Sequence, residues 1–215
     1  MLEREKLPLG VVESIAAPAS YRFQVEGSGG HAGGVLMADR KDALCAAAGL
    51  ILAIENAARS SGAPDTVATV GICEVFPGAI NSVPSRVALT LDIRDTDTAR
   101  RDAAMREITN AAQSIAETRQ VKITTDLINA DAPAACAPLV RDSLASAAAK
   151  RAIPFKTMVS RAYHDSLFMS RIAPTGMLFI PCRHGYSHRP DEYASPEDIA
   201  RGALILAESL SALSS

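Results

Sequence analysis

The sequence has no long apolar run and no block of basic residues. Its 22 Lys and Arg against 24 Asp and Glu give a net charge of −2, and no Lys/Arg cluster offers the footprint of a nucleic-acid-binding or membrane-surface protein. The most apolar stretch, Ala43–Ile54, is too short to span a bilayer. The N-terminal residues are charged and lack an apolar signal core. We therefore expect a soluble, cytoplasmic protein with no nucleic-acid or membrane partner.

Short metal-binding motifs are also missing. Neither HExxH nor HxD occurs, and the cysteines stand far apart with no CxxC or CxxH spacing. Widely spaced cysteines of this kind are typical of reduced thiols in a cytosolic protein, and we expect them to be mostly buried. The four are Cys45, Cys73, Cys136 and Cys182.

The first two thirds of the chain show a regular alternation of strand and helix signals. The predicted strands have β-branched enrichment or apolar/polar alternation, and the predicted helices are rich in Ala and Leu. Asp39 is a candidate cap for the first helix, and Asp97 precedes the second. The resulting order, β-α-β-β-α-β, predicts a ferredoxin-like domain over residues 19–129. Its strands are expected at Tyr21–Glu26, Thr66–Phe76, Arg86–Arg94 and Val121–Ile128, and its helices at Lys41–Ala58 and Thr98–Thr118.

Residues 130–215 have a different character. Leu139–Arg151 reads as a helix, and Gly176–Cys182 is a continuous apolar run typical of a buried parallel strand. A last helix begins with Ser195 as its cap and Pro196 at its first position. A parallel strand needs neighbours and cover on both faces. We therefore expect residues 1–18 and 130–215 to form part of an α/β domain that is incomplete by itself.

The stretch "GSGGHAGG" places His31 among five glycines directly after a predicted strand. It almost fits a dinucleotide-binding fingerprint, but no helix opens on the loop, and Glu55 falls inside a predicted helix. One interpretation is a tight turn with an incidental histidine. The interpretation that we favour is that glycines clear space for the His31 imidazole to donate a hydrogen bond to a ligand.

The other histidines lie in the "YHDS" and "CRHGYSHRPDEY" segments. His184 and His188 are four residues apart, but Gly185 and Pro190 argue against a helix that would place both on one metal-binding face. The segment therefore offers one candidate histidine ligand and no complete set of metal ligands. Asp191 and Glu192 are further candidates, although loop acids are more often solvated. A nucleophilic Ser–His–Asp system is an alternative, because Ser160 or Ser166 lies near the pair His164–Asp165, but no nucleophile elbow occurs.

Arg94 ends a predicted strand, and Asn81 lies in the turn "PGAINSVPS". An arginine at a strand end is commonly solvated or paired with an acid, here Asp92 or Asp95. A forked guanidinium, an amide and the His31 imidazole would together make a carboxylate clamp. Sequence spacing alone leaves open whether the three side chains meet.

Four long segments resemble the metal-dependent amidohydrolases that cleave ureido compounds: the allantoate amidohydrolases, N-carbamoyl-L-amino-acid hydrolases and ureidoglycolate amidohydrolases. They are "GGHAGGVLMADRKDALCAAAGLILAIE", "VGICEVFPGAINSVPSRVALTLDIRD", "SRAYHDSLFMSRIAPTGMLFIPC" and "GYSHRPDEYASPEDIARG". The "SRAYHDS" segment is most similar to the ureidoglycolate enzymes. The resemblance implies an α/β catalytic domain with a paired divalent-metal site, Zn or Mn, interrupted by a ferredoxin-like lid that forms a homodimer.

The resemblance also implies roles for individual residues. His31 corresponds to the lid histidine that enters the partner subunit's active site and steadies the developing oxyanion. Asn81 and Arg94 correspond to residues that hold the substrate carboxylate, and His164 to a residue lining the pocket. His188 corresponds to the last metal ligand. The implied substrate is a small ureido compound with a carboxylate.

The family's other metal ligands and its glutamate base precede the lid, upstream of the segment that matches "LERE". Because this chain starts at "MLERE", we expect it to lack them and to be inactive alone. The implied function is thus hydrolysis of a ureido or amidine C–N bond, with this chain as the C-terminal portion. The alternative is a non-catalytic dimerisation or binding module.

Overall fold

The structure, a computed structural model that describes residues 1–214, divides into two compact units. Unit 1 contains Met1–Ala16 and the residues from Pro133 to the C-terminus, and unit 2 contains Ala17–Ala132. The boundaries predicted from the sequence lie after residues 18 and 129. The chain therefore leaves unit 1 after a short N-terminal segment, completes unit 2, and returns to unit 1.

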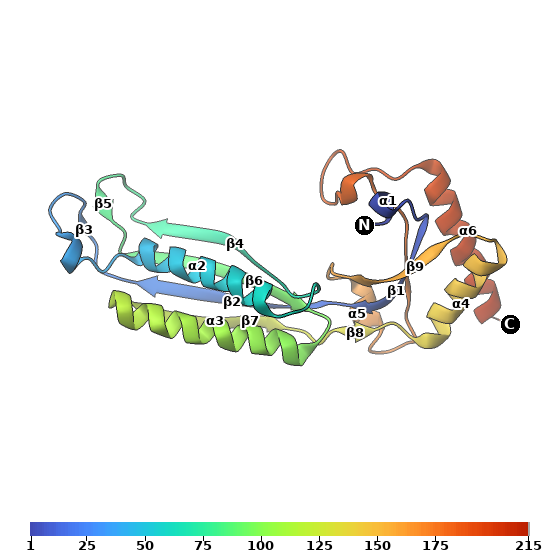
Figure 1. Cartoon of the computed structure of the whole chain (residues 1–215), viewed down its shortest axis with the longest axis horizontal. Helices are drawn as coiled ribbons and strands as arrows, with labels where there is room; N and C mark the ends of the chain where they lie inside the picture. The colour runs from blue at the N-terminus through green and yellow to red at the C-terminus, as the bar shows by residue number, and fades with distance from the viewer. Residues whose placement is uncertain (215) are drawn as a thin grey trace. The chain divides into compact units, whose positions relative to one another are not determined.

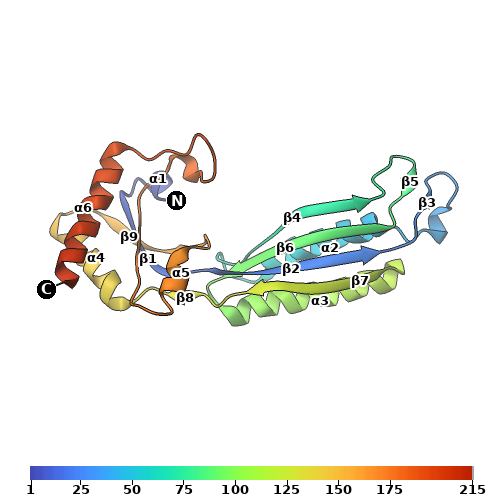
Figure 2. The same ribbon diagram turned by 180° about the vertical axis from the view of Figure 1, so that it is seen from behind.

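Unit 2 is a four-stranded antiparallel sheet with two helices on one face. The strands follow the order β4-β6-β2-β7, and every neighbouring pair is antiparallel. Helices α2 and α3 cover one face (Figure 1), and the opposite face carries no helix when seen from behind (Figure 2). The ferredoxin-like prediction is confirmed. The elements are β2 (Ala17–Glu26), α2 (Ala43–Ser60), β4 (Val67–Phe76), β6 (Arg86–Asp95), α3 (Thr98–Arg119) and β7 (Lys122–Ala130).

The alternation along β6 decides which side chains enter the core of unit 2. Leu89, Leu91 and Ile93 are at most 1% exposed and face the helices, whereas the residues between them face the open side of the sheet. Burial of such a side chain contributes about 1.5–3 kcal/mol relative to its exposed state. Arg94 is therefore placed on the open face by the same period of two that buries Ile93.

Side-chain caps fix where the two helices of unit 2 begin. Asp97, which the sequence analysis noted directly before the predicted helix, caps α3 by accepting a hydrogen bond from the backbone N–H of Arg100 at 3.0 Å. The cap predicted for α2 was wrong. Asp42, not Asp39, accepts from the first backbone N–H groups of α2, because Asp39 already belongs to the short 3₁₀ helix η1 (Met37–Asp39).

Among the described helices, α2 alone is long and apolar enough to cross a membrane by length and composition. One side of this helix packs into the core of unit 2 through residues such as Ala47, Leu50 and Ile54, each at most 1% exposed. An apolar core helix satisfies the same length and hydropathy criteria. The apolar character of α2 is accounted for by this packing.

Unit 1 is built around strand β1 (Leu9–Ile15), which the sequence analysis did not identify as a strand. β1 pairs in parallel with β9 (Phe155–Ser160) and antiparallel with β8 (Ala134–Ala135) and β10 (Met177–Phe179). The prediction of a parallel strand at Gly176–Cys182 was therefore wrong in this chain. An apolar run indicates burial but does not encode the direction of the neighbouring strand.

Two longer helices complete the core of unit 1. α4 (Pro138–Lys150) and α6 (Pro196–Leu213) pack with β1 through Leu9, Leu144 and Ile205, all at most 2% exposed. The predicted cap of α6 is confirmed, since the Ser195 hydroxyl oxygen accepts from the backbone N–H of Asp198 at 3.1 Å. The remaining short helices of unit 1 are α1 (Leu2–Glu5), α5 (Asp165–Met169) and η2 (Arg183–Gly185).

The four cysteines are free thiols, as expected, but most of them are not buried. Cys45 and Cys73 are exposed, Cys182 is half-buried, and Cys136 is buried. The expectation that they are mostly buried was wrong: Cys45 lies on the exposed side of α2, and Cys73 lies on β4, the edge strand of the unit 2 sheet.

Candidate functional site

The glycine-rich loop and the turn that contains Asn81 meet at one end of unit 2. Strand β3 (Gly30–His31) pairs with β5 (Ser82–Val83), so that His31 lies opposite Ser82. The backbone N–H of Ala32 donates to the carbonyl oxygen of Asn81 at 2.8 Å. The structure therefore brings two of the predicted site residues, His31 and Asn81, to adjacent positions. Both are exposed.

The glycines of this loop serve two different purposes. A Cβ at Gly27 would lie 2.0 Å from the carbonyl oxygen of Lys41, so only glycine permits this close approach of the two backbone segments. Gly33 and Gly34 instead border His31, where an added Cβ would make contacts of 3.5–3.6 Å at ordinary van der Waals distance. The glycine at the start of the loop is thus needed for chain packing, and those after the histidine leave its ring accessible.

The imidazole of His31 is oriented by its own loop. Its Nδ1 accepts a hydrogen bond from the backbone N–H of Gly33 at 3.1 Å. In the neutral ring an accepting Nδ1 implies that the proton resides on Nε2. The donor of the neutral imidazole is therefore Nε2–H, and the residue that carries it is exposed.

Large apolar side chains surround this end of unit 2. Leu36 is 71% exposed, Met37 78% and Ile80 104%. Together with His31 and Asn81 they form what we call the tip of unit 2. Exposed apolar groups clustered beside polar functional groups are typical of a surface that becomes covered by another molecule.

Arg94 lies at the other end of the same sheet. Arg86, at the start of β6, pairs with the ends of β2 and β4 that lead to the tip, whereas Arg94 pairs with Pro18 and Val67. Eight residues of antiparallel strand separate the two arginines, about 27 Å at the usual rise. A carboxylate clamp of His31, Asn81 and Arg94 therefore does not form within one chain.

The guanidinium of Arg94 is paired with an acid on its own strand. Its Nε donates to Oδ1 of Asp92 at 2.7 Å, and its Nη2 donates to Oδ2 at 3.1 Å. These hydrogen bonds are the main reason that the pKa of Arg94 is raised above its ordinary value. Of the two acids suggested by the sequence, Asp92 is the observed partner.

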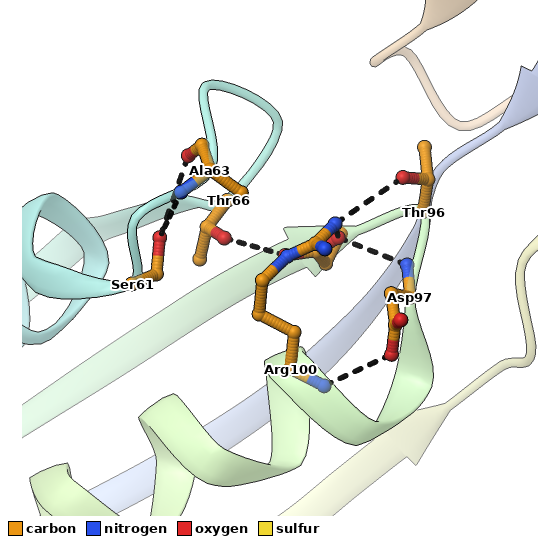
Figure 3. Close-up of polar contacts among 7 residues, drawn as sticks. Ser61, Ala63, Thr66, Thr96, Asp97 and Arg100 are labelled. Atoms are coloured by element: carbon orange, nitrogen blue, oxygen red, sulfur yellow. Dashed lines mark hydrogen bonds and ion pairs between the residues drawn. The ribbon is translucent and has the colours of Figure 1, made fainter.

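Asp95 instead anchors the end of β6 to helix α3. Its side chain is fully buried and accepts hydrogen bonds from the Arg100 guanidinium, the Thr66 hydroxyl and the backbone N–H of Asp97. Figure 3 shows Thr66, Asp97 and Arg100 converging on this point. Burial raises the pKa of the Asp95 carboxyl, but these hydrogen bonds outweigh that effect, so the pKa is lowered.

In unit 1, His164 caps the short helix α5. Its Nδ1 accepts from the backbone N–H of Ser166 at 3.1 Å, so its neutral ring, like that of His31, carries the proton on Nε2. The buried Ser160 hydroxyl donates to the carbonyl oxygen of Ala162 at 3.1 Å. The hydrogen bonds of these residues run through the backbone rather than through a Ser–His pair, and the structure gives the Ser–His–Asp alternative no support.

His188 lies in an exposed loop with a left-handed backbone, at φ 59°. Its backbone N–H donates to Oε2 of Glu192 at 3.0 Å, and Asp191 is paired with Arg189. His184 has φ 54°, so the two histidines do not share a helix face, as expected. Residues 1–214 contain no group of three or more His, Cys, Asp or Glu side chains arranged to hold a metal ion. His188 with its neighbours thus does not make a metal site by itself.

The sequence pattern of peptidase family M20/M25/M40 matches residues 11–212. The chain belongs to this family. Members of the family are generally metal-dependent.

Two curated relatives illustrate the similarity. The chain is 52% identical to a ureidoglycolate hydrolase of Arabidopsis thaliana over 215 residues, which is all of this chain and 45% of the relative. It is 38% identical to an N-carbamoyl-L-amino acid amidohydrolase of Geobacillus stearothermophilus, covering 96% of this chain and 50% of the relative. The chain thus spans about half the length of the curated relatives it matches.

A solved structure agrees with the sequence comparison. The crystal structure of AtUAH in complex with glyoxylate superposes with a TM-score of 0.92 at 52% identity, over 99% of this chain and 51% of that one. The mixed α/β architecture predicted from the sequence is therefore confirmed.

Two elements of the site escaped the sequence analysis. The backbone N–H of Gly33 that orients His31 has no signature beyond the glycine itself, and the contact between Glu192 and the backbone of His188 depends on a left-handed residue. By contrast, the partnership of Asp92 with Arg94 was visible as an acid and a base two residues apart on one face of a strand.

Proposed function

We propose that this chain forms part of an enzyme that hydrolyses a linear ureido or amidine C–N bond in a small carboxylate-bearing substrate. Ureidoglycolate is the substrate that we favour, ahead of allantoate and N-carbamoyl-L-amino acids. The observation that carries the proposal is the 52% identity, extending over all 215 residues, to a ureidoglycolate hydrolase. The 0.92 TM-score to a relative with bound glyoxylate supports the same class of ligand.

In this proposal His31 stabilises charge on the carbonyl oxygen of the ureido group. The Gly33 N–H holds the imidazole in the form that presents Nε2–H. A preorganised donor aimed at an oxygen that becomes negative in the transition state typically contributes about 10²–10³ in kcat. The Asn81 amide and the Arg94 guanidinium bind the substrate carboxylate, and His164 contributes a further contact to the substrate.

The separation between the tip of unit 2 and Arg94 points to a homodimer. Because about 27 Å of strand separates them, a small substrate cannot touch Asn81 and Arg94 of the same chain. A second copy resolves this, since the tip of one chain could then meet the Arg94 end of the other. The exposed Leu36, Met37 and Ile80 support burial of the tip against a partner.

A divalent metal, Zn or Mn, belongs to the proposal for the family as a whole, and His188 is the candidate ligand from this chain. The donor set present in residues 1–214 does not fit a metal site by itself, because one imidazole is fewer than the three or four protein ligands that such sites use. The acids flanking His188 already have partners within the loop. The steps assigned to this chain are therefore limited to orienting the substrate and stabilising the carbonyl oxygen.

The proposal can be tested by measuring ammonia release from ureidoglycolate, allantoate and an N-carbamoyl-L-amino acid. We expect no turnover by the 215-residue chain, even with added Mn²⁺ or Zn²⁺. A fusion of this chain to the part of the Arabidopsis relative that it does not match should release ammonia from ureidoglycolate. His31→Ala in that fusion should lose most of the rate, whereas the matched control Glu55→Gln, on the exposed side of α2, should not. A folded fusion that turns over none of the three substrates would contradict the proposal.

The second candidate is a non-catalytic dimerisation or binding module. The observation on its side is that residues 1–214 hold no cluster of three or more His, Cys, Asp or Glu side chains arranged for a metal ion. Both candidates are compatible with a dimer, which light scattering would detect at twice the 22.6 kDa of one chain, so the activity of the fusion is the measurement that distinguishes them. A stable dimer together with an inactive fusion would favour this second candidate, and an active fusion would exclude it.

A further inference from the structure

Asp92 and Arg94 form a two-point contact on the open face of β6. They are two residues apart, so the period of the strand places both side chains on the face that carries no helix. Both Asp92 oxygens are used, at 2.7 Å to Nε and 3.1 Å to Nη2. The side chain of Arg94 is 28% exposed and that of Asp92 39%, so the pair is only partly shielded from solvent.

Two hydrogen bonds to one carboxylate hold the guanidinium plane in one orientation. Nε and Nη2 form the side edge of the group, and a bidentate contact there restricts rotation about the last side-chain bonds. A lysine on the same strand could not be held this way, because its ammonium is a point charge without a plane.

The backbone at this position is also held firmly. Ile93 and Asp95, on either side of Arg94, are at most 1% exposed and belong to the core side of the sheet. Asp95 is further tied to the start of α3 through Arg100. The base of the Arg94 side chain is therefore anchored by its neighbours, and its far end is anchored by Asp92.

We propose that Asp92 is a positioning residue for carboxylate recognition by Arg94. This inference rests on the proposed function, in which Arg94 binds the substrate carboxylate. The substrate carboxylate meets a different edge of the guanidinium from the one that Asp92 occupies, and Asp92 stays in place when the substrate binds. Asp92 thereby determines the plane in which a substrate carboxylate is accepted.

Displacement of Asp92 by the substrate is the competing arrangement, and it is unfavourable on charge grounds. It would leave the partly buried Asp92 carboxylate without its cation and next to a second carboxylate. Like charges in contact are repelled, and an unpaired carboxylate loses the hydrogen bonds that compensate its desolvation. If Asp92 stays in place, the Arg94 guanidinium lies between the Asp92 carboxylate and the substrate carboxylate, which is the more stable arrangement of the three charges.

The first test follows the Arg94 Nε–H resonance by ¹⁵N NMR in the intact 215-residue chain, with glyoxylate as the probe. In the wild type we expect a slowly exchanging Nε–H that persists when glyoxylate is added. Asp92→Ala should speed its exchange at least tenfold and weaken glyoxylate binding at least fivefold. Asp92→Asn keeps one acceptor oxygen, so its Nε–H exchange rate and its glyoxylate affinity should lie between those of the wild type and Asp92→Ala. The matched control is Glu55→Gln, which removes the acidic partner of Arg59 in the exposed pair on α2.

The second test uses the active fusion and separates KM from kcat. Asp92→Ala should raise KM for ureidoglycolate at least fivefold with kcat changed less than twofold, whereas a general loss of stability would lower the amount of active enzyme and leave KM unchanged. Tighter glyoxylate binding or a lower KM in Asp92→Ala would overturn the inference and favour displacement. If glyoxylate binding were unchanged in Asp92→Ala but lost in Arg94→Ala, the positioning role of Asp92 would be overturned and the proposed role of Arg94 would stand. No response to glyoxylate in either the wild type or Arg94→Ala would instead remove Arg94 from the proposed site.

Discussion

The backbone N–H of Gly33 donates a hydrogen bond to Nδ1 of His31 across 3.1 Å. This contact joins two residues of the same loop, so it does not depend on a ligand or on another molecule. It assigns Nδ1 as the acceptor and Nε2–H as the donor of an exposed, neutral imidazole. The backbone of the loop therefore determines which nitrogen of the neutral ring carries the proton.

The first prediction concerns the tautomer of His31. Gly33→Pro removes the N–H that Nδ1 accepts, so the Nε2–H form should lose its preference. Gly33→Ala retains the N–H and is the matched control, because its Cβ would meet the His31 ring only at 3.6 Å. Long-range ¹H–¹⁵N spectra of the neutral ring report the tautomer directly. A wild-type ring with its proton on Nδ1 would contradict the assignment.

The second prediction concerns Arg94 in the active fusion. Arg94→Lys should raise KM for ureidoglycolate about tenfold or more, because an ammonium cannot reproduce two parallel hydrogen bonds to a carboxylate. The rate constant kcat should change less, since the carboxylate is bound in both the ground state and the transition state. Steady-state kinetics measure both quantities. Unchanged KM would remove Arg94 from the site.

Local signals in the sequence predicted local structure well. Ser195 was predicted as a helix cap and Asp97 was noted as the residue before a helix, and both accept the hydrogen bond of a helix cap. The cap of α2 was missed because Asp39 and Asp42 are both plausible by spacing. Only the 3₁₀ turn at Met37–Asp39, which depends on how the loop packs, distinguishes between them.

Relationships between distant segments could not be obtained in this way. The ferredoxin-like order followed from the alternation of elements, but the antiparallel register of β2 with β6 is what places His31 and Arg94 at opposite ends of the sheet. Three residue types suited to one clamp were present, and the sheet places them at opposite ends. Likewise, the parallel pairing of β1 with β9 joins residues more than a hundred positions apart, and no local pattern encodes it.

The third prediction concerns acid stability. The pKa of Asp95 is lowered in the folded chain, so its contribution to stability is present above its unfolded pKa of about 3.9. That contribution is lost as the pH falls through the lower folded pKa. The melting temperature of the wild type should therefore drop steeply below about pH 4, and that of Asp95→Asn should depend less on pH in this range.

The same variant should be less stable at neutral pH. Asp95 is fully buried and its partner Arg100 is 31% exposed, so loss of the charge should cost about 3 kcal/mol, at the lower end of the range for buried pairs. Urea unfolding at pH 7 measures this difference. Equal stability of the two proteins at pH 7, or parallel pH profiles, would show that the Asp95–Arg100 pair does not stabilise unit 2.

The fourth prediction concerns the first glycine of the His31 loop. Gly27→Ala would place a Cβ 2.0 Å from the Lys41 carbonyl oxygen. Backbone cannot yield as a flexible side chain does, so the segment before α2 must move. We expect a loss of about 1–3 kcal/mol in the free energy of unfolding, together with changed amide shifts through residues 28–42. Gly71→Ala is the matched control, because a Cβ there meets nothing within 4 Å. If Gly27→Ala proved as stable as Gly71→Ala, the close approach to Lys41 would not be what holds this loop in place.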